Sequence, residues 1–224
     1  MNKYLEDFYS QICHIDVLQA FNNYKNIKTI HKELTESIGC FSAATEVLQL
    51  HPAEERLVFV VGDGKYPRTA TMLSFRTRWT CVSVDPELDL GWFEKFKDYK
   101  ESLNQQVKRL QLVSDRVENL HNSLSLQSIQ KFRDFKKFLV VLPHSHAKIK
   151  STLQEFSKIF GEEQETAMVS LPCCVSTPPQ YKTRDFIRNN GYVGYTDMNV
   201  ISPKNHFDCW ENISYLNLRK KKND

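Results

Sequence analysis

The sequence lacks the features of a membrane protein, a disulfide-rich secreted fold or a strongly basic nucleic-acid-binding protein. No segment approaches the roughly 20 consecutive apolar residues that cross a bilayer, and the first 21 residues mix acids and amides into their apolar positions, unlike a secretory signal. Six cysteines are scattered without the paired C-x-x-C spacing of a zinc site. The net charge of +3 alone does not demand a nucleic-acid partner. We therefore expect an intracellular protein, cytoplasmic with a nuclear location left open, without membrane association or a metal site.

Hydrophobic spacing divides the chain into a helical beginning and an alternating remainder. Residues 3 to about 50 carry apolar residues at helical intervals, and within them Gly39 predicts a helix end and Ser42 the cap of the next helix. Short Val-rich runs then alternate with helical stretches, which predicts buried strands, βαβ units and a mainly parallel sheet. The predicted strands are Leu57–Val61, Thr80–Val84, Leu110–Ser114, Phe138–Leu142, Ala167–Leu171, Gly191–Tyr195 and Asn199–Ser202.

These elements predict an α/β fold with a Rossmann-like, mainly parallel seven-stranded sheet. Helices cover both faces, the last two strands form an antiparallel C-terminal hairpin, and a helical N-terminal extension precedes the sheet. The simplest partition places the extension at residues 1–50, the Rossmann-like domain at 51–216 and a basic tail at 217–224. The N-terminal helices are also a candidate surface for a protein partner.

A glycine turn follows the first predicted strand, and an acid ends the second. Gly62 and Gly64 permit positive φ and a close backbone approach, and the helix after them would point its N–H groups into the cleft beyond the strand ends. Asp85 follows about twenty residues later, where an acid can accept hydrogen bonds from a ribose diol. This arrangement suits an adenosine-containing ligand.

The Gly62-Asp63-Gly64 turn, Asp85, the polar turn Ser114-Asp115-Arg116 and the late hairpin resemble the class I S-adenosylmethionine-dependent methyltransferase family over roughly residues 45–215. The resemblance implies a methyl donor across the ends of strands one and two, with Asp85 on the ribose. It places Asp115 and Arg116 near the adenine, and Pro143 in the turn after strand four.

The sequence departs from the family pattern at the donor loop. Val60 stands where the family has an acid two residues before the first glycine, so the donor's ammonium group lacks its expected partner, and Asp63 is the candidate replacement. Tyr66 and Pro67 stand near the position of a third glycine. Pro67 is compatible with a helix start, whereas Tyr66 is bulky enough to obstruct the methionine part of the donor.

The turn after strand four, "VVLPHSHAKIK", contains two histidines. His144 or His146 is a candidate general base, because the unperturbed pKa of histidine near 6.5 suits proton removal at neutral pH. Both are equally compatible with ordinary turn residues. Two histidines at this spacing can also form a strand-end metal pair, but the spacing identifies no third ligand. The turn lacks the Asn/Asp-Pro-Pro motif of amino-group methyltransferases. It also lacks the Asp that ribose methyltransferases use.

The segment after strand five contains two cysteines and then an aromatic and basic stretch. Cys173 and Cys174 are candidate pocket-floor residues. Cys174 as a covalent nucleophile, as in the cytosine-5 methyltransferases of RNA, is the less favoured alternative, because the Pro-Cys that those enzymes carry at strand four is missing. Tyr181, Lys182 and Arg184 are candidate substrate-binding residues, since aromatic and basic side chains together suit base stacking and phosphate pairing. The same stretch equally fits an ordinary amphipathic helix.

Three functions remain compatible with the sequence. The first is an S-adenosylmethionine-dependent methyltransferase, a transferase that acts on RNA or another nucleic acid. The second is a catalytically inactive binding or scaffold protein on a methyltransferase fold. The third is a Rossmann-like enzyme that uses another nucleotide, or a small-molecule methyltransferase. One fold carries many functions, so the fold alone does not choose among them.

Overall fold

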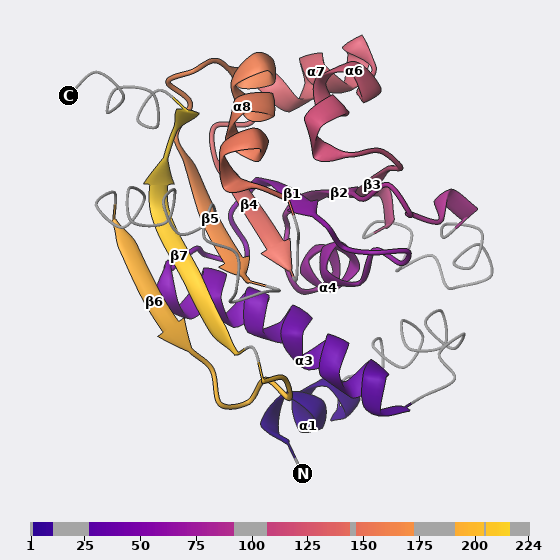
Figure 1. Ribbon diagram of the computed structural model, residues 1–224, viewed down its shortest axis with the longest axis vertical. Helices are drawn as coiled ribbons and strands as arrows, with labels where there is room; N and C mark the ends of the chain where they lie inside the picture. Colours follow the sequence, from indigo (N-terminus) through magenta and orange to yellow (C-terminus); the bar gives the residue numbers. More distant parts are fainter. Residues whose placement is uncertain are drawn as a thin grey trace.

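The computed structural model describes residues 2–10, 27–91, 107–143, 147–172, 191–203 and 205–215, and the predicted basic tail lies outside them. In this part of the chain one sheet runs in the order β3-β2-β1-β4-β5-β7-β6 (Figure 1). Its strands are β1 (Leu57–Val61), β2 (Thr80–Val84), β3 (Leu110–Val113), β4 (Phe138–Pro143), β5 (Thr166–Leu171), β6 (Tyr192–Thr196) and β7 (His206–Ile213).

Strands β1 to β5 run parallel to one another, so their carboxyl ends meet at one edge of the sheet. Leu57 of β1 is level with Thr80 of β2 and with Phe138 of β4. Strand β7 is antiparallel to both β5 and β6. The structure therefore confirms the predicted Rossmann-like, mainly parallel sheet with its antiparallel C-terminal pair.

The last strand lies later in the chain than predicted. Residues 199–202 belong to the connection after β6, and β7 begins only at His206. The prediction of a strand at Asn199–Ser202 is therefore wrong. Buried Asp208 lies inside β7, where it accepts a hydrogen bond from the Tyr192 hydroxyl (2.7 Å). This pairing lets an acid occupy a buried strand position that its residue type disfavours.

Helices cover the two faces of the sheet in separate groups (Figure 1). One face carries α1 (Lys3–Ser10), α3 (Ile27–Ser42), a π-helical turn (Ala43–Val47) and α4 (Arg68–Arg76); the other carries a 3-10 turn (Val117–Asn119), α6 (Leu120–Ser123), α7 (Leu126–Arg133) and α8 (Ile149–Phe160). Strand β1 shows why two cores form, because side chains alternate along a strand. Val58 and Val60 join the core under α3 and α4, while Leu57 and Phe59 join the other.

Helix α3 runs through Gly39 instead of ending there, and Ser42 is its last residue and makes no side-chain cap for the turn that follows. The predicted break at Gly39 is therefore wrong. A β-carbon at Gly39 would lie 2.6 Å from Cζ of Phe207 and 2.7 Å from Cγ2 of Val200. Glycine is present here because the helix approaches β7 closely, and this packing outweighs the weak helix propensity of glycine.

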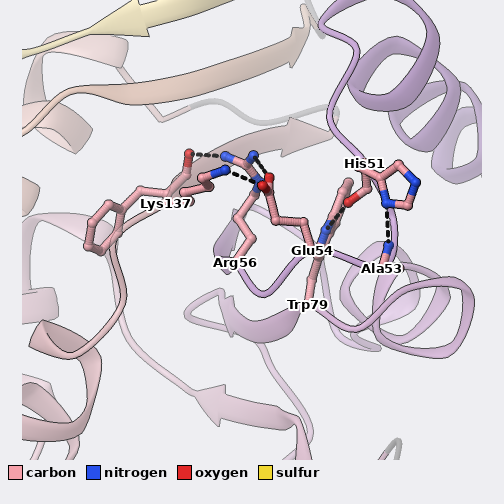
Figure 2. A network of polar contacts seen from close by, with 7 residues as sticks. His51, Ala53, Glu54, Arg56, Trp79 and Lys137 are labelled. Atoms are coloured by element: carbon pink, nitrogen blue, oxygen red, sulfur yellow. Dashed lines mark hydrogen bonds and ion pairs between the residues drawn. The ribbon is translucent and has the colours of Figure 1, made fainter.

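A polar network joins β1 to β4 at the edge opposite the carboxyl ends (Figure 2). Glu54 binds Lys137 and the guanidinium of Arg56, and Arg56 also donates to the carbonyl of Phe138 (3.3 Å). The indole N–H of Trp79 donates to the carbonyl of His51 (3.4 Å). These contacts hold the segment before β1 against the starts of β2 and β4.

The buried residues of α1, including Tyr4, Leu5 and Phe8, pack inside this chain. Tyr4 also donates a hydrogen bond to Asp197, and Asn2 donates to the carbonyl of Asn199 (2.7 Å).

Across the described ranges, no helix combines the length and apolarity that a membrane crossing requires.

Candidate functional site

A cavity of about 570 Å³ opens at the carboxyl ends of β1, β2 and β4. This volume lies within the roughly 300–1,000 Å³ range of small-molecule sites. Helix α3, the start of α4, the turns after β1, β2 and β3, and Ala147 also contribute to its lining. The lining residues are Glu33, Glu36, Ser37, Val61, Gly62, Asp63, Gly64, Arg68, Thr69, Val84, Asp85, Pro86, Glu87, Arg116, Val117, Glu118, Pro143 and Ala147.

The glycine turn and Asp85 meet at this cavity. Gly62 and Gly64 have φ of 81° and 80°, the left-handed conformation that glycine adopts without steric cost. The backbone N–H of Gly64 donates to Oδ2 of Asp85 (2.9 Å), and that of Glu87 donates to Oδ1 (2.8 Å). Each carboxylate oxygen has a second lone pair, so Asp85 retains the capacity to accept from ligand hydroxyl groups.

Tyr66 does not appear among the described residues that line the cavity. It packs against the core cluster that contains Val58 and Val60. The obstruction expected from its size is therefore not present in this structure.

Asp63 caps a helix from inside the protein. Its carboxylate accepts hydrogen bonds from the backbone N–H groups of Thr69 (2.9 Å) and Ala70 (3.0 Å), at the start of α4, and from the Ser83 hydroxyl (3.1 Å). Burial raises the pKa of Asp63 to about 6, and the hydrogen bonds from Ala70, Thr69 and Ser83 oppose the rise. These contacts use Asp63 to anchor the start of α4, which leaves it little capacity for a ligand's ammonium group.

Helix α3 supplies two acids that the sequence analysis did not single out. The helix face that borders the cavity carries Glu33, Glu36 and Ser37. Glu36 and Ser37 lie three and four residues after Glu33, the spacing that places side chains on one face of a helix. The hydroxyl groups of Ser37 and Thr69 are hydrogen bonded (3.0 Å), which ties α3 to the start of α4. In the sequence these polar residues form a stripe beside the apolar stripe of Leu34 and Ile38, and that polar stripe is the signal that could have identified them.

Arg68 lies between the acids of α3 and Asp85. Its Nη1 is 2.8 Å from Oε2 of Glu33. Burial lowers the pKa of Arg68 to about 10, and the Asp85 carboxylate opposes the fall, so Arg68 is cationic at neutral pH. Burial and the neighbouring Glu36 raise the pKa of Glu33 to about 7, and Lys32 opposes that rise.

The remaining predicted site residues divide into three groups. Arg116 and Pro143 line the cavity, as does the Gly62-Asp63-Gly64 turn. Asp115 instead accepts hydrogen bonds from Arg116, Asn119 and Ser123 in the turn after β3, and its place near an adenine stays a prediction. Outside the described residues lie His144, His146, Cys173, Cys174, Tyr181, Lys182 and Arg184. Within the described residues, no group of three or more His, Cys, Asp or Glu side chains is arranged to hold a metal ion.

No protein-family model matches the sequence, and no curated protein is significantly similar to it. Among solved structures, an rRNA methylase from Streptococcus thermophilus aligns at 14% identity over 78% of this chain and 96% of that one, with a TM-score of 0.45. A 16S rRNA (adenine(1408)-N(1))-methyltransferase from Catenulisporales acidiphilia aligns at 15% identity over 76% and 91%, with a TM-score of 0.43. A mutant of MtNAS in complex with S-adenosylmethionine aligns at 11% identity over 87% and 70%, with a TM-score of 0.44. At these identities the likeness concerns the fold alone.

Proposed function

We propose that this protein is an S-adenosylmethionine-dependent methyltransferase and that its donor binds in the cavity at the ends of β1 and β2. The observation that supports it best is the convergence of the Gly62–Gly64 turn and Asp85 on one cavity of about 570 Å³. Two turns that are about twenty residues apart in sequence thus offer backbone approach and a carboxylate to the same ligand. This is the combination that an adenosyl group requires.

The residues of the cavity fit the parts of the donor. Asp85 would accept hydrogen bonds from the ribose hydroxyls, while Val61, Val84 and Val117 offer apolar surface for the adenine. Bound there, the donor supplies an electrophilic methyl group on a sulfonium sulfur. Pro143 and Ala147 border the side of the cavity toward the turn after β4. In this proposal His144 or His146, in that turn, removes a proton from the substrate atom that is methylated.

For the substrate we propose RNA or another nucleic acid. Lys65, directly after the Gly62-Asp63-Gly64 turn, is exposed, so it can meet a phosphate group of a bound nucleic acid. Tyr181, Lys182 and Arg184 are the residues proposed to stack on a base and pair with phosphate. RNA affinity measured over a salt series should fall steeply with ionic strength if several phosphates are bound. Affinity that is absent, or insensitive to salt, would contradict a nucleic-acid substrate.

Titration calorimetry with S-adenosylmethionine tests the donor site. Asp85→Asn should weaken binding by about 10- to 100-fold, because it replaces a charged hydrogen-bond acceptor at the ribose. Asp134→Asn is the matched control, since Asp134 is exposed at the end of α7 on the other face of the sheet. Absence of both heat and thermal shift at millimolar donor would favour the alternative, an inactive binding or scaffold protein that keeps the fold.

A further inference from the structure

The acids on α3 line the cavity from a different element than Asp85, the acid proposed to bind the ribose. Glu33 and Glu36 reach the cavity from helix α3, whereas Asp85 comes from the end of β2. Arg68 lies between the two groups, because it pairs with Glu33 and also interacts with Asp85. The α3 side of the cavity therefore combines negative and positive groups within reach of one ligand.

Glu36 carries unused hydrogen-bonding capacity in a buried position. Only 4% of Glu36 is exposed, and its Oε1 has no hydrogen-bond partner among the described residues. The nearest cation paired with it is Lys32, whose Nζ is 3.8 Å away and thus beyond hydrogen-bond distance. A buried carboxylate oxygen without a donor is energetically costly. A ligand that brings N–H donors and a positive charge would remove that cost.

Neither Asp63 nor Val60, which stands at the position of the family's acid, can take this role. Asp63 already accepts three hydrogen bonds from the start of α4 and from Ser83. Val60, which replaces the family's acid, is fully buried in the core under α3 and cannot meet a ligand. Among these positions, Glu36 combines a place on the cavity wall with a carboxylate oxygen that lacks a donor.

Arg68 provides the complementary charge. Its guanidinium is cationic at neutral pH, is held by Glu33 at 2.8 Å and carries five N–H donors in a fixed plane. Such a group binds a carboxylate while it keeps its contact with Glu33. An ammonium at Glu36 and a carboxylate at Arg68 describe a zwitterion, which is the form of an α-amino acid at neutral pH.

We infer that α3 binds the amino-acid end of the methyl donor, with Glu36, assisted by Glu33, on its ammonium group and Arg68 on its carboxylate. This inference rests on the proposed function, because it names the part of the cavity that holds the methionine moiety. Glu36 of helix α3 thereby takes the place of the acid that the family has in β1, where this chain has Val60.

Two ligands that share an adenosine separate this inference from the proposed function. S-adenosylhomocysteine carries the amino-acid end, whereas 5′-methylthioadenosine lacks it. Calorimetry on the full chain should show that Glu36→Gln weakens S-adenosylhomocysteine binding by about 10- to 100-fold. The affinity for 5′-methylthioadenosine should stay within about twofold, because adenosine contacts do not involve Glu36. Glu46→Gln, an exposed acid in the turn after α3, is the matched control and should change neither affinity.

The remaining outcomes are distinguishable. If Glu36→Gln binds S-adenosylhomocysteine as the unmodified chain does, the inference is overturned while the donor site stands. If the variant keeps its thermal unfolding midpoint but loses both ligands equally, Glu36 shapes the cavity as a whole, and its assignment to the amino-acid end is overturned. If the unmodified chain binds neither ligand, the proposed function fails, and the inference fails with it.

Discussion

Replacement of Asp63 by alanine tests whether this acid anchors helix α4 or serves a ligand. The change removes the acceptor of three hydrogen bonds and leaves the donors of Thr69, Ala70 and Ser83 buried. Buried donors without partners cost about 1–3 kcal/mol each, so the loss of all three amounts to roughly 3–9 kcal/mol. These hydrogen bonds lie within the chain and need no ligand. The free energy of unfolding, and not ligand affinity, is therefore the informative measurement.

The buried charge of Asp63 offsets part of this loss. Burial raises its pKa from 3.8 to about 6, which corresponds to about 3 kcal/mol at about 1.4 kcal/mol per pH unit. At pH 7.5, where the carboxyl is ionised, we therefore expect Asp63→Ala to lower the free energy of unfolding by about 3 kcal/mol, the middle of that range less the cost of the buried charge. Urea denaturation of the full chain, followed by circular dichroism, measures this difference.

The pH dependence of the difference gives a second check. Because the pKa of Asp63 is higher in the folded chain, its protonated form stabilises the fold at low pH. That stability is lost as the pH rises through about 6. The deficit of Asp63→Ala should consequently be about 1 kcal/mol larger at pH 5 than at pH 7.5. Asp134→Ala, on an exposed turn, should change stability by at most about 0.5 kcal/mol at either pH. A variant as stable as the unmodified chain at pH 7.5, or a deficit that shrinks toward pH 5, would refute the reasoning.

Two further substitutions test local packing and capping. Gly39→Ala should lower the free energy of unfolding by about 1–3 kcal/mol, because the new methyl group would overlap Phe207 and Val200; a higher urea midpoint would show that helix propensity prevails instead. Ser125→Ala should cost about 1 kcal/mol, since the Ser125 hydroxyl accepts from the backbone N–H of Ser128 (3.1 Å) at the start of α7. Hydrogen exchange across residues 126–133 should then accelerate, whereas Ser125→Asp should retain the cap and the protection.

Sequence patterns predicted the strands of the parallel part because their signal is local. The runs at β1 and β2 are short, apolar on both faces and followed by turn residues, and the observed bounds match the predicted ones. The turn chemistry is equally local, so the sequence alone places Gly62, Gly64 and Asp85 at one edge of the sheet. Parallel strands bring their carboxyl ends together whatever the helices between them do.

The acids of α3 and the course of β7 were harder to predict because tertiary packing decides them. Helix periodicity places Glu33 and Glu36 on one face, but only the docking of α3 on the sheet turns that face toward the cavity. The local sequence at Gly39 predicts a helix end. In the structure the helix continues through Gly39, where only a residue without a β-carbon leaves room for Phe207. In β7, the polar residue Asp208 interrupts the apolar pattern that predicts a buried strand. The Tyr192 hydroxyl that satisfies it is sixteen residues away, so local sequence does not reveal the pairing.

The hydrogen bond between Ser37 and Thr69 makes the N-terminal helix part of the cavity wall. A shortened chain that began after residue 50 would keep every strand of the sheet while losing the wall that carries Glu33 and Glu36. Such a fragment would also uncover the apolar residues on which Leu34 and Ile38 rest. For protein engineering, α3 should therefore be kept in any graft, fusion or minimised version that must retain the cavity.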